Sequence, residues 1–305
     1  MFNVGRLNVF REVIARSSFS DAADALSYSQ SAVSQAIATL EGEAGVALIE
    51  RSRGGARATV AGAALAGHVS GILAQMETAE TEIAAIAAGH GGRLRTASFP
   101  TAGAALMPQA IAGFRASHPG VELTLAEGEP EEIAPRLRAG EFDLVLLFEF
   151  EGVGERLSAG MRRFELFEDP LHLAMRHDHP FAERKELRLE DLRGESWVQT
   201  SAASPCARHV IRSCHAAGFE PAVSFESDDY QTVQGLVAAG VGVALIPQLA
   251  LSTVRPDIRV RPLHPRSPVR KIFAATPRAA AATPAVATML DVLRQAARRA
   301  GDATA

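Results

Sequence analysis

The chain has 305 residues, of which 47% are hydrophobic and 22% are charged. Because a typical domain has roughly 150 residues, this length predicts two or three folded units, and the composition excludes a largely disordered chain. The formal net charge of -4 excludes an overall positive field that would attract nucleic acid or an anionic membrane. Any surface for such a partner must therefore be local.

Cysteine content and hydropathy give the expected compartment. Two cysteines cannot form a disulfide framework, and the nine histidines are scattered rather than grouped with cysteine at zinc-ligand spacing. The N-terminus lacks the apolar core of a signal peptide, and no run reaches the roughly 18 apolar residues of a membrane span. These features predict a cytoplasmic protein with no metal, no cofactor and no membrane segment.

Three helices are predicted in the first 45 residues. Apolar residues recur at helical spacing in residues 4–17, and a short second helix through residues 22–26 is expected to begin at Ser20 or Asp21. Ser29 is expected to cap a third helix with one apolar face and an opposite face that is polar and uncharged. Two short helices joined by a tight turn predict a helix-turn-helix, although an ordinary surface helix has the same pattern.

A hairpin is predicted after the third helix. Residues 47–50 and 57–60 flank the turn Ser52-Arg53-Gly54-Gly55, and this pair of strands is typical of a wing. Arginines 51, 53 and 57 concentrate positive charge there, which DNA phosphates would favour. A solvated loop is the alternative interpretation.

A long helix is predicted over residues 61–88. Its apolar residues alternate in steps of four and three, as in a heptad seam that packs against a partner helix, and the seam comprises Leu65, Val69, Ile72, Met76, Ile83 and Ile86. Packing against its own domain is the alternative. A glycine-rich segment, residues 89–92, is expected to end this helix and to begin a new domain.

Strands alternate with helices from residue 93 onward, which predicts parallel α/β units. Two similar halves joined by crossing strands are expected to leave a cleft between them.

The residues also resemble the LysR-type bacterial transcriptional regulators. The resemblance is carried by Leu7-x2-Phe10-x2-Val13, Ser18-Phe19-Ser20-x-Ala22-Ala23-x2-Leu26, Ser29-Gln30-Ser31-Ala32-Val33-Ser34-x2-Ile37-x2-Leu40-Glu41, Gly45-x2-Leu48-Ile49-x-Arg51, Thr59-x-Ala61-Gly62, Gly140-x2-Asp143-Leu144, His179-Pro180 and Ala239-Gly240-Val241-Gly242-Val243-Ala244-Leu245-Ile246-Pro247. It covers nearly the whole chain. Ile49 and Ala58 depart from the family's usual Phe and Leu, which affects local packing rather than DNA binding.

The resemblance implies a fold and an assembly. The fold is α/β: a winged helix-turn-helix (residues 1–60), a linker helix for dimerisation (61–90) and a two-lobed effector domain similar to periplasmic solute-binding proteins (91–305). Lobe I is expected to comprise residues 91–162 and 269–305, and lobe II residues 163–268. The family implies a homodimer through the linker helix, usually assembled into a tetramer, on double-stranded DNA.

Site residues follow from the family and from topology. By analogy, Gln30, Ser31, Ser34 and Gln35 face the major groove, and Arg51, Arg53 and Arg57 contact phosphates or the minor groove. Ligands of open α/β sheets bind at the carboxyl ends of strands and at helix N-termini, which selects Ser98, Thr101, Glu129, Phe148, Gln199 and Thr200. Their hydroxyl and amide donors, an apolar wall and a helix N-terminus suit a small carboxylate effector. Because no arginine is among them to clamp it, we expect moderate affinity.

Three alternatives stay open. Cys206 and Cys214 occupy the part of the chain in which peroxide-sensing relatives carry a reactive cysteine pair, and Pro205 places Cys206 at a helix start that could lower its pKa. Their spacing of eight on one helix is too long for a disulfide, so buried structural cysteines are favoured. A solute-binding module is the second alternative. An enzyme is the third, and the sequence contains no phosphate-binding glycine loop, nucleophile elbow or metal motif.

Overall fold

The computed structural model describes residues 2–52, 55–87, 92–151, 160–278 and 283–302. Its packing divides the chain into two compact units. The first comprises residues 1–95, 120–122 and 135–143, and the second comprises residues 96–119, 123–134 and 144–305.

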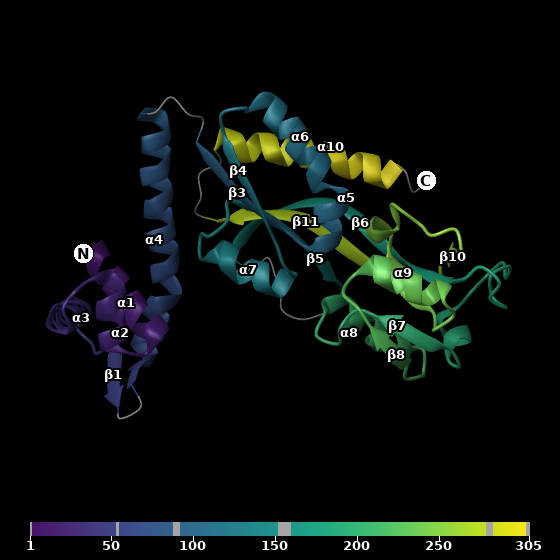
Figure 1. Ribbon diagram of the computed structural model, residues 1–305, viewed down its shortest axis with the longest axis horizontal. Helices are drawn as coiled ribbons and strands as arrows, with labels where there is room; N and C mark the ends of the chain where they lie inside the picture. Colours follow the sequence, from purple (N-terminus) through teal and green to yellow (C-terminus); the bar gives the residue numbers. More distant parts are fainter. Residues whose placement is uncertain (1, 53–54, 88–91, 152–159, 279–282, 303–305) are drawn as a thin grey trace. The chain divides into compact units, whose positions relative to one another are not determined.

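Three helices form the core of the first unit: α1 (Val4–Arg16), α2 (Phe19–Leu26) and α3 (Gln30–Ala44), shown in purple in Figure 1. They begin after Asn3, Ser18 and Ser29, and each of these side chains accepts a hydrogen bond from a backbone N–H of the first turn. The predicted cap at Ser20 or Asp21 was wrong. Ser17 ends α1 in the left-handed conformation (φ 53°), which leaves Ser18 extended and ready to cap α2.

The wing is an antiparallel pair, β1 (Ile49–Ser52) and β2 (Gly55–Ala58). Both strands lie about two residues closer to the turn than predicted, because Thr59 already belongs to the next helix start: its hydroxyl donates to the Ala47 carbonyl and accepts from the Gly62 N–H. The predicted Arg53-Gly54 turn lies outside the described residues. Glu41 Oε1 accepts from the N–H groups of Leu48 and Ile49, so α3 and the wing are held together.

The long helix α4 (Val60–Ala87) starts against the same core. A Cβ atom at Gly62 would lie 2.0 Å from the Leu48 carbonyl oxygen, so glycine is required for this close approach. Val69 is 1% exposed and packs in the core formed by α1, α2 and α3. The glycine-rich segment predicted after this helix falls, except for Gly92, outside the described residues.

The described part of the second unit is organised by a seven-stranded sheet with the order β10-β6-β11-β5-β3-β4, to which β9 adds beside β6. Its strands are β3 (Arg93–Ser98), β4 (Glu122–Glu127), β5 (Leu144–Phe150), β6 (Met161–Arg176), β9 (Ala244–Pro247), β10 (Ile258–Arg261) and β11 (Val269–Pro277). Strand β6 crosses between the lobes: residues 161–170 pair with β11, and residues 171–176 pair with β9 and β10.

This sheet is mixed, whereas the alternation of strands and helices predicted parallel pairing. Strand β3 is parallel to β5, but β11 runs antiparallel to both β5 and β6. The reason is that β6 and β11 are crossing strands that join the lobes rather than parts of β-α-β units. In lobe II, β7 (Ser196–Gln199) and β8 (Ala222–Glu226) form a separate parallel pair.

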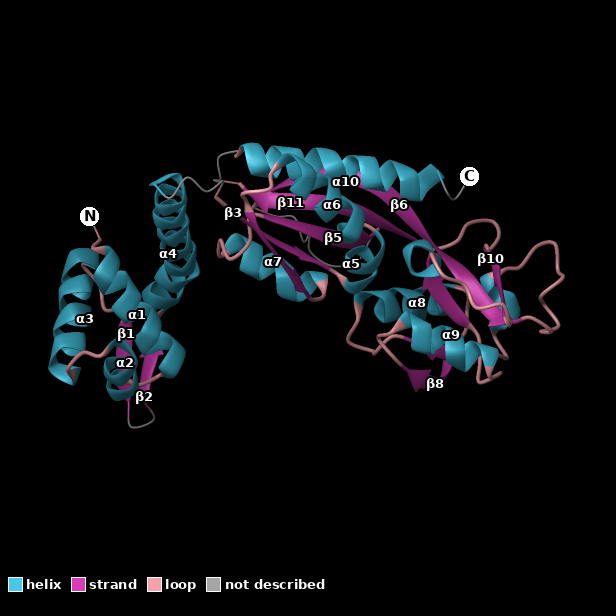
Figure 2. Ribbon diagram, turned by 45° about the horizontal axis from the view of Figure 1, so that its top comes forward, coloured by secondary structure: helices cyan, strands magenta, loops and turns pink. Residues whose placement is uncertain are grey.

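Helices cover the strands, as Figure 2 shows in cyan. Helices α6 (Met107–Ser117) and α10 (Pro284–Asp302) pack side by side, with buried Phe114 and Met289 among their side chains. The other helices with predicted counterparts are α7 (Pro130–Arg138), α8 (Pro205–Ala216) and α9 (Tyr230–Ala238). The loop predicted at residues 100–103 is instead a short helix, α5 (Pro100–Ala105), because Pro100 suits a first helical position. Strand β10 was not predicted.

Candidate DNA interface and effector pocket

The N-terminal half of α3 presents the polar side chains selected for DNA reading. Gln30, Ser31 and Gln35 are exposed and Ser34 is half-buried, whereas Val33, Ile37 and Leu40 on the opposite face are at most 2% exposed. Ser29 caps the helix as predicted, with its hydroxyl 3.2 Å from the Ala32 nitrogen.

Charge around this face favours an anionic partner. Residues 30–40 contain no acidic side chain, and the next acid along the helix, Glu41, is occupied by two N–H groups of the wing. On the wing itself, Arg57 is exposed and Arg51 lies on β1. Arg53 lies outside the described residues.

The predicted seam of α4 divides into two parts. Leu65 and Val69 pack against the helices of their own domain, so Val69, at 1% exposed, was wrong as a contact for a partner helix. Further along, Ile72, Met76 and Ile83 are 40%, 41% and 67% exposed. Ile86 lies on α4, but its side chain is outside the described set. An apolar surface is therefore left on the second half of the helix.

A candidate effector pocket lies within the second unit, between the residues assigned to lobe I and those assigned to lobe II. It is lined by Phe99, Pro100, Thr101, Glu129, Phe148, Thr200, Ser204, Cys206, Asp228, Tyr230 and Arg270. Four of the six predicted residues are in this set: Thr101, Glu129, Phe148 and Thr200. Ser98 and Gln199 are not. Both are buried, and the Ser98 hydroxyl lies beneath α5, 3.1 Å from where a Cβ atom of Gly103 would be.

Arg270 is the residue that the sequence analysis missed, and the expectation of a pocket without arginine was wrong. Its Nε lies 2.8 Å from Asp169 Oδ2, its Nη2 donates to the Thr101 hydroxyl at 2.7 Å, and its Nη1 lies 3.9 Å from Cys206 Sγ. The guanidinium carbon is 4.7 Å and 5.0 Å from the ring centres of Phe148 and Phe99. Arg270 therefore joins the two lobes at the floor of the pocket.

The sequence carries no local signal for Arg270. Residues 272–275 of β11 are all buried, so no alternation along this strand separates an inward face from an outward one. The Arg270 side chain is 2% exposed and that of Asp169 is 1% exposed. A buried charge needs a partner of opposite charge, and Asp169 provides it.

Glu129 is a carboxyl of the pocket whose pKa is shifted towards neutral pH. Burial raises the pKa of its carboxyl to about 7; the charge of Arg270 opposes that rise, and the charges of Glu131, Asp228 and Glu132 add to it. Among the described residues, none donates a hydrogen bond to this carboxyl. Glu129 is therefore close to half-protonated at neutral pH.

Both cysteines are buried, as the structural interpretation predicts. Cys206 is 7% exposed and Cys214 is 0% exposed. Burial raises the pKa of the Cys206 thiol, although Arg270 and a hydrogen bond from Tyr230 oppose this, so the expected lowering at the helix start was wrong. Burial and the nearby Glu220 charge raise the pKa of Cys214 to about 12.

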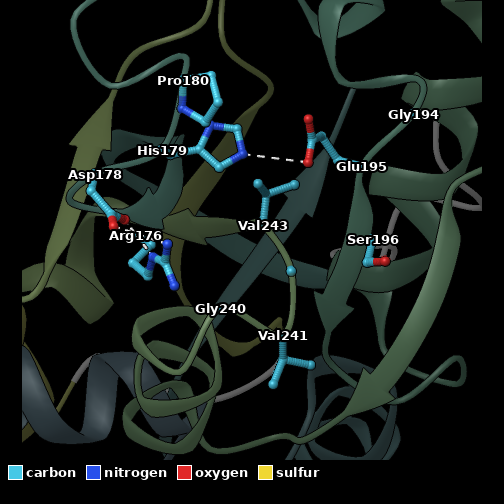
Figure 3. A pocket seen from close by; sticks show the side chains of 11 residues that line it. Arg176, Asp178, His179, Pro180, Gly194, Glu195, Ser196, Gly240, Val241 and Val243 are labelled. Atoms are coloured by element: carbon cyan, nitrogen blue, oxygen red, sulfur yellow. Dashed lines mark hydrogen bonds and ion pairs between the residues drawn. The ribbon is translucent and has the colours of Figure 1, made fainter.

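A second pocket, of about 300 Å³, lies in lobe II. Figure 3 shows Arg176 beside Asp178, which accepts from its Nη2 at 2.9 Å, and His179 with its Nε2 3.3 Å from Glu195 Oε2. Residues 240–243 form another wall. Since each of these basic groups faces a carboxylate, the pocket has little unpaired charge, and none of the predicted site residues lines its described surface.

Comparison with known proteins identifies both parts of the chain. Residues 4–63 match the family described as "Bacterial regulatory helix-turn-helix protein, lysR family", and residues 87–298 match "LysR substrate binding domain". The chain belongs to the LysR family. It is thus a LysR-type DNA-binding transcriptional regulator with an effector-binding domain, and the family resemblance and the two-lobed fold predicted from the sequence are confirmed.

Individual relatives agree with this membership. The chain is 32% identical over 296 residues, 97% of both chains, to the probable HTH-type transcriptional regulator LrrA of Synechococcus elongatus. It is 28% identical over 256 residues to the hydrogen peroxide-inducible genes activator of Dickeya chrysanthemi, covering 83% of this chain and 82% of that one. The solved structure of full-length CbnR with its target DNA superimposes with a TM-score of 0.64 at 22% identity, over 97% and 100% of the two chains. No described helix has the length and apolar character needed to span a bilayer.

Proposed function

We propose that this LysR-family regulator reads its operator with the N-terminal half of α3. Gln30 and Gln35 are exposed and suit bidentate pairing with adenine in the major groove, and Ser31 and Ser34 suit a base edge or a phosphate. Arg51, Arg53 and Arg57 of the wing supply phosphate or minor-groove contacts. The boundaries for this domain remain residues 1–60, with the linker helix at 61–90.

The regulator is proposed to act as a homodimer, and further as a tetramer, in the cytoplasm where its operator lies. The exposed apolar side chains of Ile72, Met76 and Ile83 form the part of the seam that supports a partner helix. We expect no enzymatic activity, because transcriptional control needs binding alone.

The effector is proposed to bind in the pocket around Arg270. One observation carries this: the lining residues come from both lobes, with Thr101, Glu129 and Phe148 on lobe I and Thr200, Cys206 and Tyr230 on lobe II. A ligand held by both lobes favours one relative orientation over another, and it can shift the equilibrium only as far as its affinities for the two differ. The structure does not test the small carboxylate expected from the sequence, and the acidic side chains of Glu129 and Asp228 in this lining favour a different class of ligand.

A metabolite screen on the full chain tests this function. Compounds that raise the melting temperature are then titrated against the protein bound to operator DNA, measured by fluorescence anisotropy. We expect a compound that stabilises the wild type to change its operator affinity, and Thr101→Val to lose both effects while keeping ligand-free DNA affinity. Thr276→Val, a buried threonine of β11 outside the pocket, is the control. Stabilisation that survives in Thr101→Val would place the effector elsewhere.

A thiol switch at Cys206 is the second candidate, because this thiol lines the pocket beside Arg270 and one relative is a hydrogen peroxide-inducible activator. In the proposed step the Cys206 thiolate attacks one peroxide oxygen. An S–O bond forms, the O–O bond breaks, the sulfur is oxidised to a sulfenic acid, and the peroxide is reduced to hydroxide, which takes a proton to become water. Cys214 is too far along α8 to resolve it as a disulfide, since eight residues of helix rise roughly 12 Å.

Peroxide titration separates the two candidates. If Cys206 is the switch, peroxide changes operator affinity in the wild type and in Cys214→Ser, and a sulfenic acid probe labels both, whereas Cys206→Ser is inert. Equal operator affinity before and after peroxide in the wild type would remove this candidate.

A further inference from the structure

The effector pocket carries more negative than positive charge. Arg270 is its one described cation, and Asp169 already neutralises it through a buried ion pair at 2.8 Å. The carboxyl groups of Glu129 and Asp228 also line the pocket, one from each lobe. A carboxylate ligand would add a like charge to this set, whereas a cationic ligand would reduce the imbalance.

Among the described residues, no side chain or backbone N–H donates a hydrogen bond to the half-buried carboxyl of Glu129. The neighbouring acids are engaged: Glu131 pairs with Arg208, and Asp228 Oδ1 accepts from the Ser201 N–H at 2.9 Å. Within the described chain no such donor reaches Glu129. A ligand that brings its own N–H donors can therefore bond to Glu129 without displacing a donor of the described chain.

The size of the cavity indicates which part of the ligand enters. It measures about 20 Å³, enough for one water-sized group. A primary ammonium group has this size and offers three donors. The neighbouring neutral groups are already engaged, because the Thr101 hydroxyl accepts from Arg270 and the Thr200 and Ser204 hydroxyls bond to each other.

We propose that the pocket binds an organic cation, a small molecule with a primary ammonium group held between Glu129 of lobe I and Asp228 of lobe II. This inference rests on the proposed function, in which this pocket is the effector site. Besides these two carboxyls, the charged and titratable groups that face Glu129 or adjoin it in the pocket are Arg270, Cys206, Tyr230, Glu131 and Glu132. An ammonium bridge between the lobes would favour their closed arrangement.

The test uses three probes with one carbon skeleton: n-butylamine, butanamide and butyrate. Thermal unfolding of the full chain is followed with each probe at millimolar concentration and matched ionic strength. We expect butylamine to raise the melting temperature of the wild type and of Glu132→Gln, and to have no effect on Glu129→Gln or Asp228→Asn. The proposal would be overturned if butyrate stabilised the wild type, if all three probes stabilised it equally, or if none did. It would also be overturned if butylamine still stabilised Glu129→Gln.

The pH dependence of binding gives a second readout. If the ammonium group needs ionised Glu129, its apparent affinity follows the ionised fraction, which rises about tenfold between about pH 6 and about pH 8 for a pKa of about 7. Calorimetric titration with butylamine should show this rise in the wild type and a flat profile in Glu129→Gln. A wild-type affinity for butylamine that stays level or falls as pH rises would contradict the proposal.

Operator binding distinguishes a failure of this inference from a failure of the proposed function. Butylamine binding that leaves operator affinity unchanged would keep the ligand class and overturn regulation through this pocket. A carboxylate that binds here and changes operator affinity would overturn the proposed ligand class and keep regulation through this pocket.

Discussion

Arg270 Nε and Asp169 Oδ2 lie 2.8 Å apart, and both side chains are almost completely buried. The second carboxylate oxygen of Asp169 accepts from the Leu249 N–H at 3.1 Å, so one acid fixes the arginine of β11 and the first residues after β9. Asp169→Asn should therefore lower the free energy of unfolding by about 3–5 kcal/mol, because the buried guanidinium loses its counter-charge. Chemical denaturation measures this.

An exposed pair provides the control for that experiment. Asp178 pairs with Arg176, and both side chains are about half exposed. Asp178→Asn should have little effect on stability, because solvent screens such a pair. If the two substitutions lowered the free energy of unfolding equally, burial of the Arg270–Asp169 pair would add nothing to its contribution to stability.

Base reading is assigned to α3. Gln30→Ala and Gln35→Ala should each weaken binding to the operator by about 1–3 kcal/mol and leave binding to random DNA nearly unchanged. Thr39→Ala is the control, since Thr39 is exposed on the same helix and its hydroxyl donates to the Gln35 carbonyl. An equal loss on both kinds of DNA would make these glutamines phosphate contacts.

Charge neutralisation is assigned to the wing. Arg57→Ala should weaken binding to operator and to random DNA alike, and it should reduce the slope of affinity against salt concentration by about one unit. Anisotropy titrations at several salt concentrations measure both quantities. If slope and affinity both equal those of the wild type, Arg57 lies outside the interface.

Dimerisation is assigned to the exposed half of the α4 seam. Met76→Asp should place an unpaired charge twice in a symmetric interface and shift the protein toward the monomer in sedimentation at micromolar concentration. Gln75→Asp adds the same charge to an exposed position next to the seam and should leave the mass unchanged. A wild-type mass for Met76→Asp would exclude this helix face as the interface.

Glu129 should give stability a characteristic pH dependence. Its pKa of about 7 in the native state lies above the ordinary value of 4.5, so the native state holds a proton that the unfolded chain has released. The stability from this group is present below about pH 4.5 and is lost as pH rises through about 7. Urea midpoints of the wild type should therefore fall relative to those of Glu129→Gln across this range. Parallel profiles would contradict the raised pKa.

The helices of the first unit and most strands of the second could be predicted because local signals define them. Ser29 caps the start of α3, and the periodicity of apolar residues identifies the buried faces of the helices. The cap of α2 could not be predicted, because it depends on the left-handed conformation of Ser17. The ends of the wing strands could not be predicted either, because they depend on the tertiary hydrogen bonds of Thr59.

The effector pocket was only partly predictable. Strand ends and helix starts selected Thr101, Glu129, Phe148 and Thr200, which line the pocket, because these positions depend on topology alone. Arg270 was not predicted because its position depends on Asp169, a partner 101 residues earlier in the chain. It also depends on the antiparallel pairing of β6 and β11, which was not predicted. Ser98 lies outside the pocket lining because α5 covers the end of its strand.

Selection of DNA fragments from a random library tests most directly that this chain is a sequence-specific regulator that reads DNA through α3. The wild type should enrich one short motif, present as two related half-sites because a dimer binds it, and the double variant Gln30→Ala/Gln35→Ala should enrich a relaxed or different motif. Enrichment of no motif by the wild type, or of an identical motif by the double variant, would contradict it.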